Sequence, residues 1–508
     1  MTYKKTLILA LLLSSFAAQA RGLVFDAVSL SKHKADALWF NSDNAAGLSF
    51  HPINDFNSVG FLYGLGKGNF HLMQEGSSYA DLGFDTQGAV RAGKFSLWGK
   101  FSYNNITEDG AMFNTMLFNP FDERKLYGVA DSVSSKWKRQ AYLLEFKAGL
   151  PLSGKRLYAG LHLRYSNSIA AKQNDPRAES YKYFITLKPS LVYSSPVGAF
   201  GLNGYYSNEF ERSVPSLSNS SEPQSVYILK GLGNFTKESV GSGGLNTMYY
   251  RINTFGASAQ YGYEGKGLEL LAEAGLLYHF TKTTQSATRP LNMGSVEVLD
   301  IKASLQALFG QKKSQKLSLY FLNRVSEGTE HTSIWGKDSG RWEVKSSAIM
   351  SVYSTLKAGA SYDFFIMEGN FWRWKYHTGL AWKNKKDEYK LPKSVFSYSK
   401  AEINVALDRN FLISSSSISA GLGGGYSKSL SGKYSYSGIR SKDAPATLWY
   451  PHDLRILTSD YIRAYISAGY SGKIKKDINI NVSVSLAWLY AGGDLMRLSP
   501  SFSLGLLF

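Results

Sequence analysis

Near the C-terminus lies the stretch ININVSVSLAWLY (Ile478–Tyr490), whose even positions are apolar and whose odd positions are mostly small or polar. Side chains of a β-strand point to opposite faces in alternation, so this pattern predicts a strand with one apolar and one polar face. After a turn through Gly492 and Gly493, a second alternating run ends on Phe508. A long apolar face with aromatic ends, opposite a wet face, is typical of a transmembrane β-barrel strand.

The same alternation recurs along the chain and predicts an antiparallel transmembrane β-barrel of about eighteen strands, with fourteen or sixteen left open. In 267–281 it predicts that Leu276 faces lipid and Glu273 faces the interior, and in 371–383 it places Trp372 on the apolar face. The expected strands are 57–75, 80–91, 94–105, 139–150, 155–166, 181–194, 199–211, 252–263, 267–281, 296–309, 315–326, 352–365, 371–383, 397–409, 413–427, 460–472, 477–490 and 497–508.

The segments between these strands alternate between two lengths, as a barrel with short periplasmic turns and long extracellular loops requires. Ala92-Gly93 and Glu264-Gly265-Lys266 are typical of the short class. The long, polar segments are expected at 106–138, 167–180, 212–251, 282–295, 327–351, 384–396 and 428–459.

The N-terminus predicts export. Lys4 and Lys5, an apolar run and the small residues Ala18 and Ala20 form a signal peptide over residues 1–20. No later stretch is long and apolar enough for a membrane-spanning helix, and the chain has no cysteine. We therefore expect three parts, which are the signal peptide, an N-terminal periplasmic or plug segment over 21–56, and an outer-membrane barrel over 57–508. The expected location is the outer membrane of a Gram-negative cell.

Net charge is +18, with the basic residues scattered along the chain. Nucleic-acid binding would need them gathered on one helix or patch, so we expect no nucleic-acid partner. Outer-membrane lipid and anionic lipopolysaccharide are the partners that this charge favours.

Many charged residues fall on the inward parity of the strands. Two readings stay open: these groups pair with one another and with a plug, or they form an ion- or solute-selecting constriction. The candidates for the lumen are Glu145, Lys147, His162, Arg164, Glu269, Glu273, His279, Arg373, Lys375 and His377.

Catalysis is not favoured by the sequence. It contains no nucleophile elbow, zinc-helix motif or phosphate loop in a suitable context, so we expect neither an enzyme nor a cofactor. Three inward histidines among so many polar groups do not indicate a metal site, and none is expected.

Residues 21–56 lack the strand alternation and contain Trp39, Phe40, Asn44 and Gly47. The stretch Asn44-Ala45-Ala46-Gly47-Leu48 resembles the plug of FadL-like long-chain fatty-acid transporters, although Ala45 stands where that superfamily has proline. These four residues are therefore the plug candidates, and a tail packed under the barrel is the alternative. The whole chain also resembles an uncharacterised outer-membrane barrel family of Bacteroidota, whose members are often encoded beside TonB-dependent receptors and surface lipoproteins.

The sequence therefore predicts a channel or transporter for an unidentified small solute, with residues 21–56 as plug or gate. The main alternative is a non-transporting partner of a TonB-dependent receptor complex, with a surface lipoprotein as a further partner, that captures or presents substrate through long surface loops. A barrel enzyme and a surface structural or adhesion protein are the remaining alternatives.

Overall fold

A computed structural model describes residues 27–53, 55–154, 156–219, 221–240, 245–369, 371–414, 416–475 and 478–508. The expected signal peptide lies outside the described residues. The eighteen barrel strands are β1 (Phe56–Gly68), β2 (Ser78–Ala92), β3 (Phe95–Ala111), β5 (Ser135–Ser153), β6 (Leu157–Lys172), β7 (Arg177–Ser195), β8 (Gly198–Ser216), β11 (Met248–Gly265), β12 (Leu268–Gln285), β13 (Leu291–Phe309), β14 (Gln315–Gly336), β15 (Arg341–Glu368), β16 (Phe371–Tyr389), β17 (Ser394–Ile413), β18 (Ser416–Ser435), β19 (Tyr461–Lys475), β20 (Ile478–Tyr490) and β21 (Met496–Leu507).

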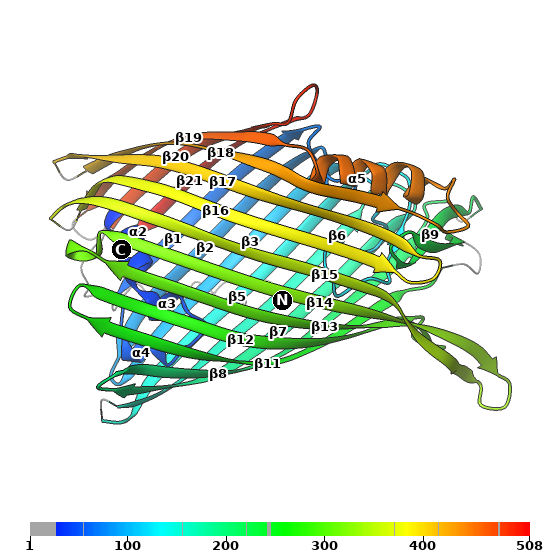
Figure 1. Ribbon diagram of the computed structural model, residues 1–508, viewed down its shortest axis with the longest axis horizontal. Coiled ribbons are helices and arrows are strands. Elements are labelled where there is room, and N and C mark those ends of the chain that lie inside the picture. The colour runs from blue at the N-terminus through cyan, green and yellow to red at the C-terminus, as the bar shows by residue number, and fades with distance from the viewer. Residues whose placement is uncertain are drawn as a thin grey trace.

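These strands form one closed antiparallel sheet, which confirms the predicted fold class and strand number (Figure 1). Closure joins the first strand to the last, with Phe61 of β1 opposite Leu504 of β21. The alternation of the terminal stretch is also confirmed, because Val484 and Trp488 of β20 are 50% and 40% exposed on the outer face. The apolar side of each strand is therefore the outer surface of the barrel.

Each end of the barrel has its own kind of connection. At one end, here the short-turn end, neighbouring strands are joined by turns such as 93–94 and 266–267. The other end, the loop end, carries the longer connections. The prediction of long loops at 167–180 and 327–351 is wrong. These segments are mostly strand, with brief turns at 173–176 and 337–340. Where a strand runs past the membrane its outer face need not be apolar, so the alternation that would have revealed it is missing.

Three inserted segments fold together into a cap at the loop end. The first is the stretch 112–134, here the inner loop, which contributes β4 (Val129–Ala130). The segment between β8 and β11 adds β9 (Gln224–Gly231) and β10 (Asn234–Val240), and β4, β9 and β10 form a small sheet. The segment between β18 and β19 contains a π-helical turn, η2 (Pro445–Trp449), and α5 (Tyr450–Leu457). Figure 1 shows α5 and β9 at the same end of the barrel.

The cap has its own apolar packing. Phe113 of the inner loop stacks on Trp449 at 5.2 Å between ring centroids, and Tyr227 and Phe235 of the small sheet join the same buried cluster. Aromatic surface of this kind stabilises a fold when water is excluded from it. The cap is therefore a folded layer across the loop end.

The N-terminal helices lie at the opposite end. They are α2 (Ala27–Asp36), α3 (Leu38–Asn41) and α4 (Gly47–Phe50), drawn in blue at the short-turn end in Figure 1. A 3₁₀ turn, η1 (Gln311–Lys313), joins β13 to β14 at this end. Residues 27–53, here the plug segment, lead into β1 at Phe56.

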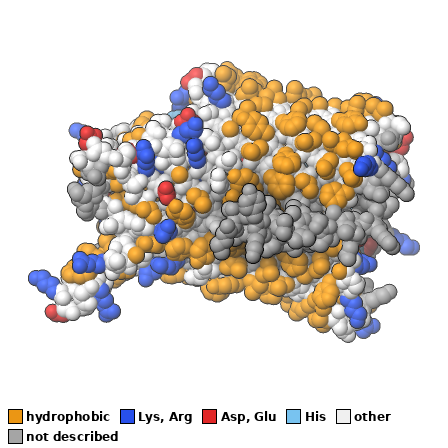
Figure 2. Space-filling view, turned by 180° about the vertical axis from the view of Figure 1, so that it is seen from behind, with side chains coloured by type: hydrophobic (Ala, Val, Ile, Leu, Met, Phe, Trp, Pro, Cys, Tyr) orange, Lys and Arg blue, Asp and Glu red, His pale blue; other side chains and the backbone are white. Residues whose placement is uncertain are grey.

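The outer surface carries a broad field of hydrophobic side chains, with charged groups gathered toward the ends in Figure 2. Exposed apolar residues on it include Leu276, Tyr278, Ile301 and Ile403. Among the described residues no helix is long and apolar enough to cross a membrane. The apolar field is the surface that a bilayer would cover.

We expect Leu276→Arg to destabilise the barrel strongly. Leu276 lies near the middle of β12 with 53% of its surface exposed on the apolar side. A charge placed there would face lipid, at a cost of about 2–4 kcal/mol near the midplane. Denaturant titration of protein folded in vesicles measures the change in free energy. Glu273→Gln, on the inner face of the same strand, is the control; equal losses from both would contradict the assignment of faces.

Candidate functional site

The plug segment is fastened to strands on several sides of the bore. At its start, Ala27 N donates to Ser471 Oγ on β19 at 3.3 Å. Lys316 Nζ, at the start of β14, donates to the carbonyl of Ala35 at 2.8 Å. Farther along, α3 contacts β12, and α4 contacts β3, β5, β6 and β7. The segment therefore crosses the short-turn end of the bore instead of hanging from one edge.

Asn44 is the best-anchored residue of the plug segment. Its Oδ1 accepts the N–H groups of Ala46 at 3.0 Å and Gly47 at 3.3 Å, which satisfies donors where α4 begins. Its Nδ2 donates to Leu191 O on β7 at 3.1 Å and to Gln260 Oε1 on β11 at 3.0 Å. One buried side chain thus both shapes the local turn and joins it to two wall strands.

The aromatic plug residues pack against the inner wall. Trp39 meets Phe50 edge-on at 5.5 Å between ring centroids, and its indole lies against the backbone of Gly262 on β11. Phe40 meets Trp98 of β3 in the same way at 5.9 Å. Edge-to-face pairs of this kind add to the stability that burial provides.

Two glycines of the wall let the plug backbone come close. Gly149 and Gly160 lie opposite each other on β5 and β6. A Cβ added at Gly160 would lie 2.1 Å from Ala46 N, and one at Gly149 would lie 2.7 Å from Ala45 O. Because the neighbouring atoms belong to backbone, no side-chain rotation could make room. The absence of side chains at these two glycines therefore lets the start of α4 pack directly against the wall.

Charged side chains of the wall hold the loop between α3 and α4. Lys147 Nζ donates to the carbonyls of Phe40 at 3.0 Å and Ser42 at 2.8 Å. Lys188 on β7 pairs with Asp43 at 2.7 Å. Since a cation also satisfies carbonyls that the end of a helix leaves free, Lys147 contributes to the end of α3.

The bore candidates from β5 and β6 come together. His162 and Glu145 lie 2.8 Å apart, and Arg164 Nε lies 3.7 Å from Glu145. They border the plug, because Lys147 on the same strand reaches it. This is mutual pairing of inward charges, one of the two readings that the sequence left open.

A second group forms on β15 and β16. His377 bonds to Asp363 at 2.8 Å, and Lys375 lies 3.4 Å from the same carboxylate. On β12, Glu269 pairs with Lys313 of η1, and His279 bonds to Thr254 at 2.8 Å. These candidates thus lie in separate places around the wall instead of in one ring.

Arg373 does not join them, and its expected place in the lumen is wrong. It sits in a bulge at the start of β16, where the register with β15 shifts, and its side chain is 58% exposed and paired with Glu368 at the turn. The same bulge turns Trp372 inward, where it is buried in a cluster with Val28 of α2. A bulge inserts one extra residue, so the parity of the strand reverses across it.

A cavity of about 600 Å³ lies between the plug segment and the wall. Asp43 of the plug lines it together with Arg164, Lys188, Glu273 and Lys302 of the wall. Both signs of charge therefore face the same space. A polar cavity of this size can hold water or a small polar solute.

The inner loop is a second structure that crosses the bore. It leaves the wall between β3 and β5, yet Glu123 reaches Lys385 of β16 at 2.9 Å and Arg324 of β14 at 3.6 Å. Thr355 of β15 also donates to Glu123, at 3.3 Å. Because β14, β15 and β16 lie far around the sheet from β3 and β5, the loop spans the interior.

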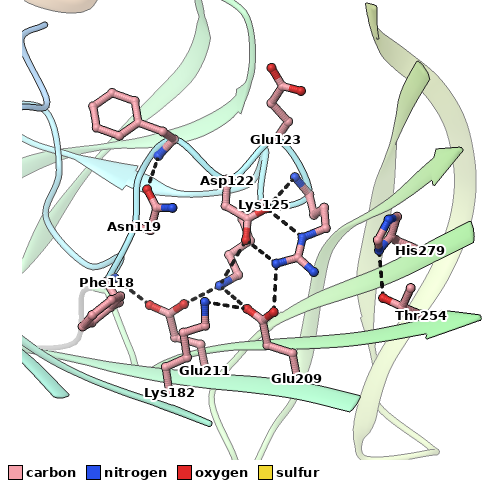
Figure 3. A network of polar contacts seen from close by, with 12 residues as sticks. Phe118, Asn119, Asp122, Glu123, Lys125, Lys182, Glu209, Glu211, Thr254 and His279 are labelled. Atoms are coloured by element: carbon pink, nitrogen blue, oxygen red, sulfur yellow. Dashed lines mark hydrogen bonds and ion pairs between the residues drawn. The ribbon is translucent and has the colours of Figure 1, made fainter. Parts of the chain in front are cut away.

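A buried ion network ties the inner loop to β8 (Figure 3). Lys125 lies 2.5 Å from Glu211 and 2.9 Å from Glu209, while Arg124 bonds to Asp122 and to Glu209 at 2.8 Å. Burial would lower the pKa of Lys125, but the carboxylates of Glu211, Glu209 and Asp122 hold that pKa well above its usual range. Burial would raise the pKa of Asp122, yet Arg124 keeps that pKa far below its ordinary value. Lys125 and Asp122 are therefore both charged at neutral pH.

This network is not among the features predicted from the sequence. Residues 122–125 read as an ordinary polar surface loop, and Glu209 and Glu211 lie far away in sequence. Two cues were present: Asp122-Glu-Arg-Lys125 gathers four charges, and Glu209 and Glu211 share the inward parity of β8. Neither cue says which strand a loop will reach.

Metal binding has no candidate in the part of the chain that the structure describes, where no group of three His, Asp or Glu side chains has the spacing of a metal site. His162, His279 and His377 belong to different strands and bond to Glu145, Thr254 and Asp363, respectively.

The chain belongs to a family of unknown function, DUF6850, whose model matches residues 45–508. The match includes α4 and every barrel strand. No curated protein matches this chain. The resemblances to FadL-like transporters and to a family of Bacteroidota remain expectations from the sequence.

Solved structures with a similar outline are outer-membrane transport proteins at low identity. The outer membrane transporter YddB of Escherichia coli has a TM-score of 0.39 at 8% identity, covering 89% of this chain and 80% of that one. The ferric yersiniabactin uptake receptor FyuA of Yersinia pestis has 0.41 at 8%, covering 89% and 79%. The siderophore receptor PiuA of Acinetobacter baumannii has 0.41 at 10%, covering 89% and 81%. At this identity, what those proteins bind does not transfer to this chain.

Proposed function

We propose that this protein is an outer-membrane channel for a small solute and that the plug segment gates it at the short-turn end, on the periplasmic side. The observation that carries the proposal is the path of residues 27–53 across the bore. They are held by side chains from β5, β7, β11, β14 and β19. A transmembrane barrel needs no such internal crossing to be stable, so the crossing suits control of passage.

The contacts that hold the plug segment are compatible with its movement out of the bore. Part of the contact is polar, through Asn44, Lys147 and Lys188, and such bonds can exchange for water when the segment leaves. The segment continues into β1 through only a short stretch after α4. The polar cavity beside it would offer a solute both signs of charge on the way through.

Deleting residues 27–53 is expected to raise the single-channel conductance of the purified protein in planar bilayers several-fold. Removing the segment frees the cross-section that it occupies, while the barrel from Phe56 onward keeps all its strand pairings. Uptake of a large antibiotic by cells that express the variant should rise in parallel.

The matched control shortens the projecting turn of the β14–β15 hairpin at 337–340, which lies away from the bore. That variant should conduct like the full-length protein. Heat-modifiable migration on gels checks that both variants fold. Equal conductance for the full-length protein and the deletion would mean that the plug segment does not gate. No conductance from either protein would contradict the channel itself.

A second candidate function is favoured by the hairpin of β14 and β15, which projects beyond the rest of the barrel in Figure 1. It exposes Ile334, Trp342, Val344 and Ile349. Exposed apolar side chains on a projecting arm suit docking to a partner such as a TonB-dependent receptor or a surface lipoprotein. Trp342→Ser with Val344→Ser should then abolish co-purification of the partner, and Leu391→Ser, on another exposed loop, should not. Retention of the partner by the double variant would exclude the hairpin as its docking site.

A further inference from the structure

Three lysines stand in one row across the inner wall of the barrel. The register places Lys357 of β15 opposite Lys383 of β16, and Lys383 opposite Lys400 of β17. Their parity is inward, because Thr355 and Lys385, two residues away on the same strands, bond to Glu123 of the inner loop. Like charges directly opposite each other destabilise a sheet, so this row calls for a compensating anion.

The protein supplies that compensation only in part. Lys400 lies 3.5 Å from Glu402. Lys385, two residues farther along β16 than Lys383, pairs with Glu123 at 2.9 Å and with Asp387 at 3.2 Å. In the described ranges, by contrast, neither Lys357 nor Lys383 forms an ion pair, and both are half-buried. Two neighbouring ammonium groups therefore face the interior without a carboxylate of their own.

These two lysines open into a cavity of about 400 Å³ beneath the cap. Its carboxylates are engaged elsewhere. Asp122 bonds to Arg124, Asp453 accepts from Met73 N and Trp449 Nε1, and Glu123 and Asp387 pair with Lys385. The positive charge of Lys357 and Lys383 is therefore what the cavity offers to a ligand.

Aromatic side chains make up another part of the lining, among them Tyr353, Tyr398, Phe121 and Tyr450. Lys383 Nζ lies 5.1 Å from the ring centroid of Tyr398, which steadies the ammonium group beside the cavity. A space of this volume with a few convergent charges and an aromatic wall has the features of a small-molecule site.

We propose that this cavity binds an anionic small molecule through its carboxylate or phosphate groups, with Lys357 and Lys383 as the residues that contact the charge. The site lies between the cap and the polar cavity at the plug segment, so it selects the solute of the channel proposed above and rests on that function for its biological role. The binding itself does not depend on gating.

The test is calorimetric titration of the purified full-length protein in detergent with citrate, a tricarboxylate, and with tripolyphosphate. Uncharged maltotriose is the neutral probe. We expect one or both anions to bind and maltotriose not to bind. Lys357→Gln with Lys383→Gln should weaken anion binding by at least about tenfold, since each lost charge-assisted hydrogen bond is a strong one. The anion that binds more tightly shows whether the site prefers carboxylate or phosphate groups.

The matched control is Lys428→Gln, which removes an exposed lysine of β18 that pairs with Asp460 and lines neither cavity. It should leave the affinity unchanged. If neither anion binds, or if the double glutamine variant binds as tightly as the unaltered protein, the site does not exist. Heat-modifiability confirms that the double variant is folded. If the double variant loses anion binding and deletion of the plug segment leaves conductance unchanged, the site is upheld and the gate is excluded. If the double variant binds the anion as before and the deletion raises conductance, the gate is upheld and the site is excluded.

Discussion

Replacing Glu211 with alanine is expected to free the inner loop from β8, at a cost of about 3–5 kcal/mol to the local structure. Glu211 and Lys125 are both fully buried and face each other at 2.5 Å. Loss of the carboxylate leaves the buried ammonium group with less opposite charge around it. Removing one partner of a buried pair is costly because the other partner stays behind unpaired.

Glu211 also accepts the backbone N–H of Phe118 and the hydroxyl of Ser180, each at 2.7 Å. Alanine therefore also leaves these two donors, one of them fully buried, without their partner, which adds to the loss. Amide hydrogen exchange over 112–134 is the direct measurement, and we expect faster exchange there with little change in the barrel strands. A loosened loop should also make the channel current noisier or larger.

Two variants make this result specific. Glu211→Gln keeps acceptors for both donors and loses only the charge, so its effect should be intermediate. Glu238→Ala removes an exposed carboxylate from β10 and should leave exchange in the inner loop unchanged. Unchanged exchange in Glu211→Ala would mean that the network does not hold the loop.

The barrel could be predicted from the sequence because the membrane imposes its pattern on every strand. A side chain on the outer face must be apolar, so alternation in stretches such as 478–490 gives both the strand and its orientation. Outside the bilayer that requirement ends. The long extensions of β14 and β15 toward Gly336 and Arg341 were therefore expected as loops.

The bore could be predicted less completely. Parity alone places Glu145 and His162 inside, and the structure has them 2.8 Å apart. Parity fails at Arg373, since the bulge in which it lies cannot be seen in one sequence. The contact of Lys125 with Glu211 depends on how a loop folds back through the barrel, which no local pattern specifies.

Two segments cross the interior. The plug segment spans the short-turn end and lines the polar cavity. The inner loop and cap span the loop end and line the cavity that contains Lys357 and Lys383. In the proposed channel, a solute that enters at the loop end would therefore pass the cap first and the plug segment last. Such an arrangement can hold a solute inside before it is released, provided that the two crossings open independently.

Introducing leucine at Gly160 is expected to expel the plug segment while the barrel stays folded. Its Cβ would lie 2.1 Å from Ala46 N, and the clash with backbone cannot be relieved by a rotamer change. The start of α4 would have to move away, taking with it the contacts of Asn44 with Leu191 and Gln260. Conductance in planar bilayers should approach that of the variant lacking residues 27–53.

The same substitution at Gly64 is the matched control. Gly64 is opposite Asp81 in the β1–β2 pairing, on the bore side, and an added Cβ there would have no atom within 4 Å. Gly64→Leu should therefore conduct like the unaltered protein. In Gly160→Leu, residues 27–53 should also become sensitive to protease added from the short-turn side. A variant at Gly160 that keeps both low conductance and a protected plug segment would show that α4 does not rest on this glycine, because a leucine cannot share the space that the backbone of Ala46 occupies.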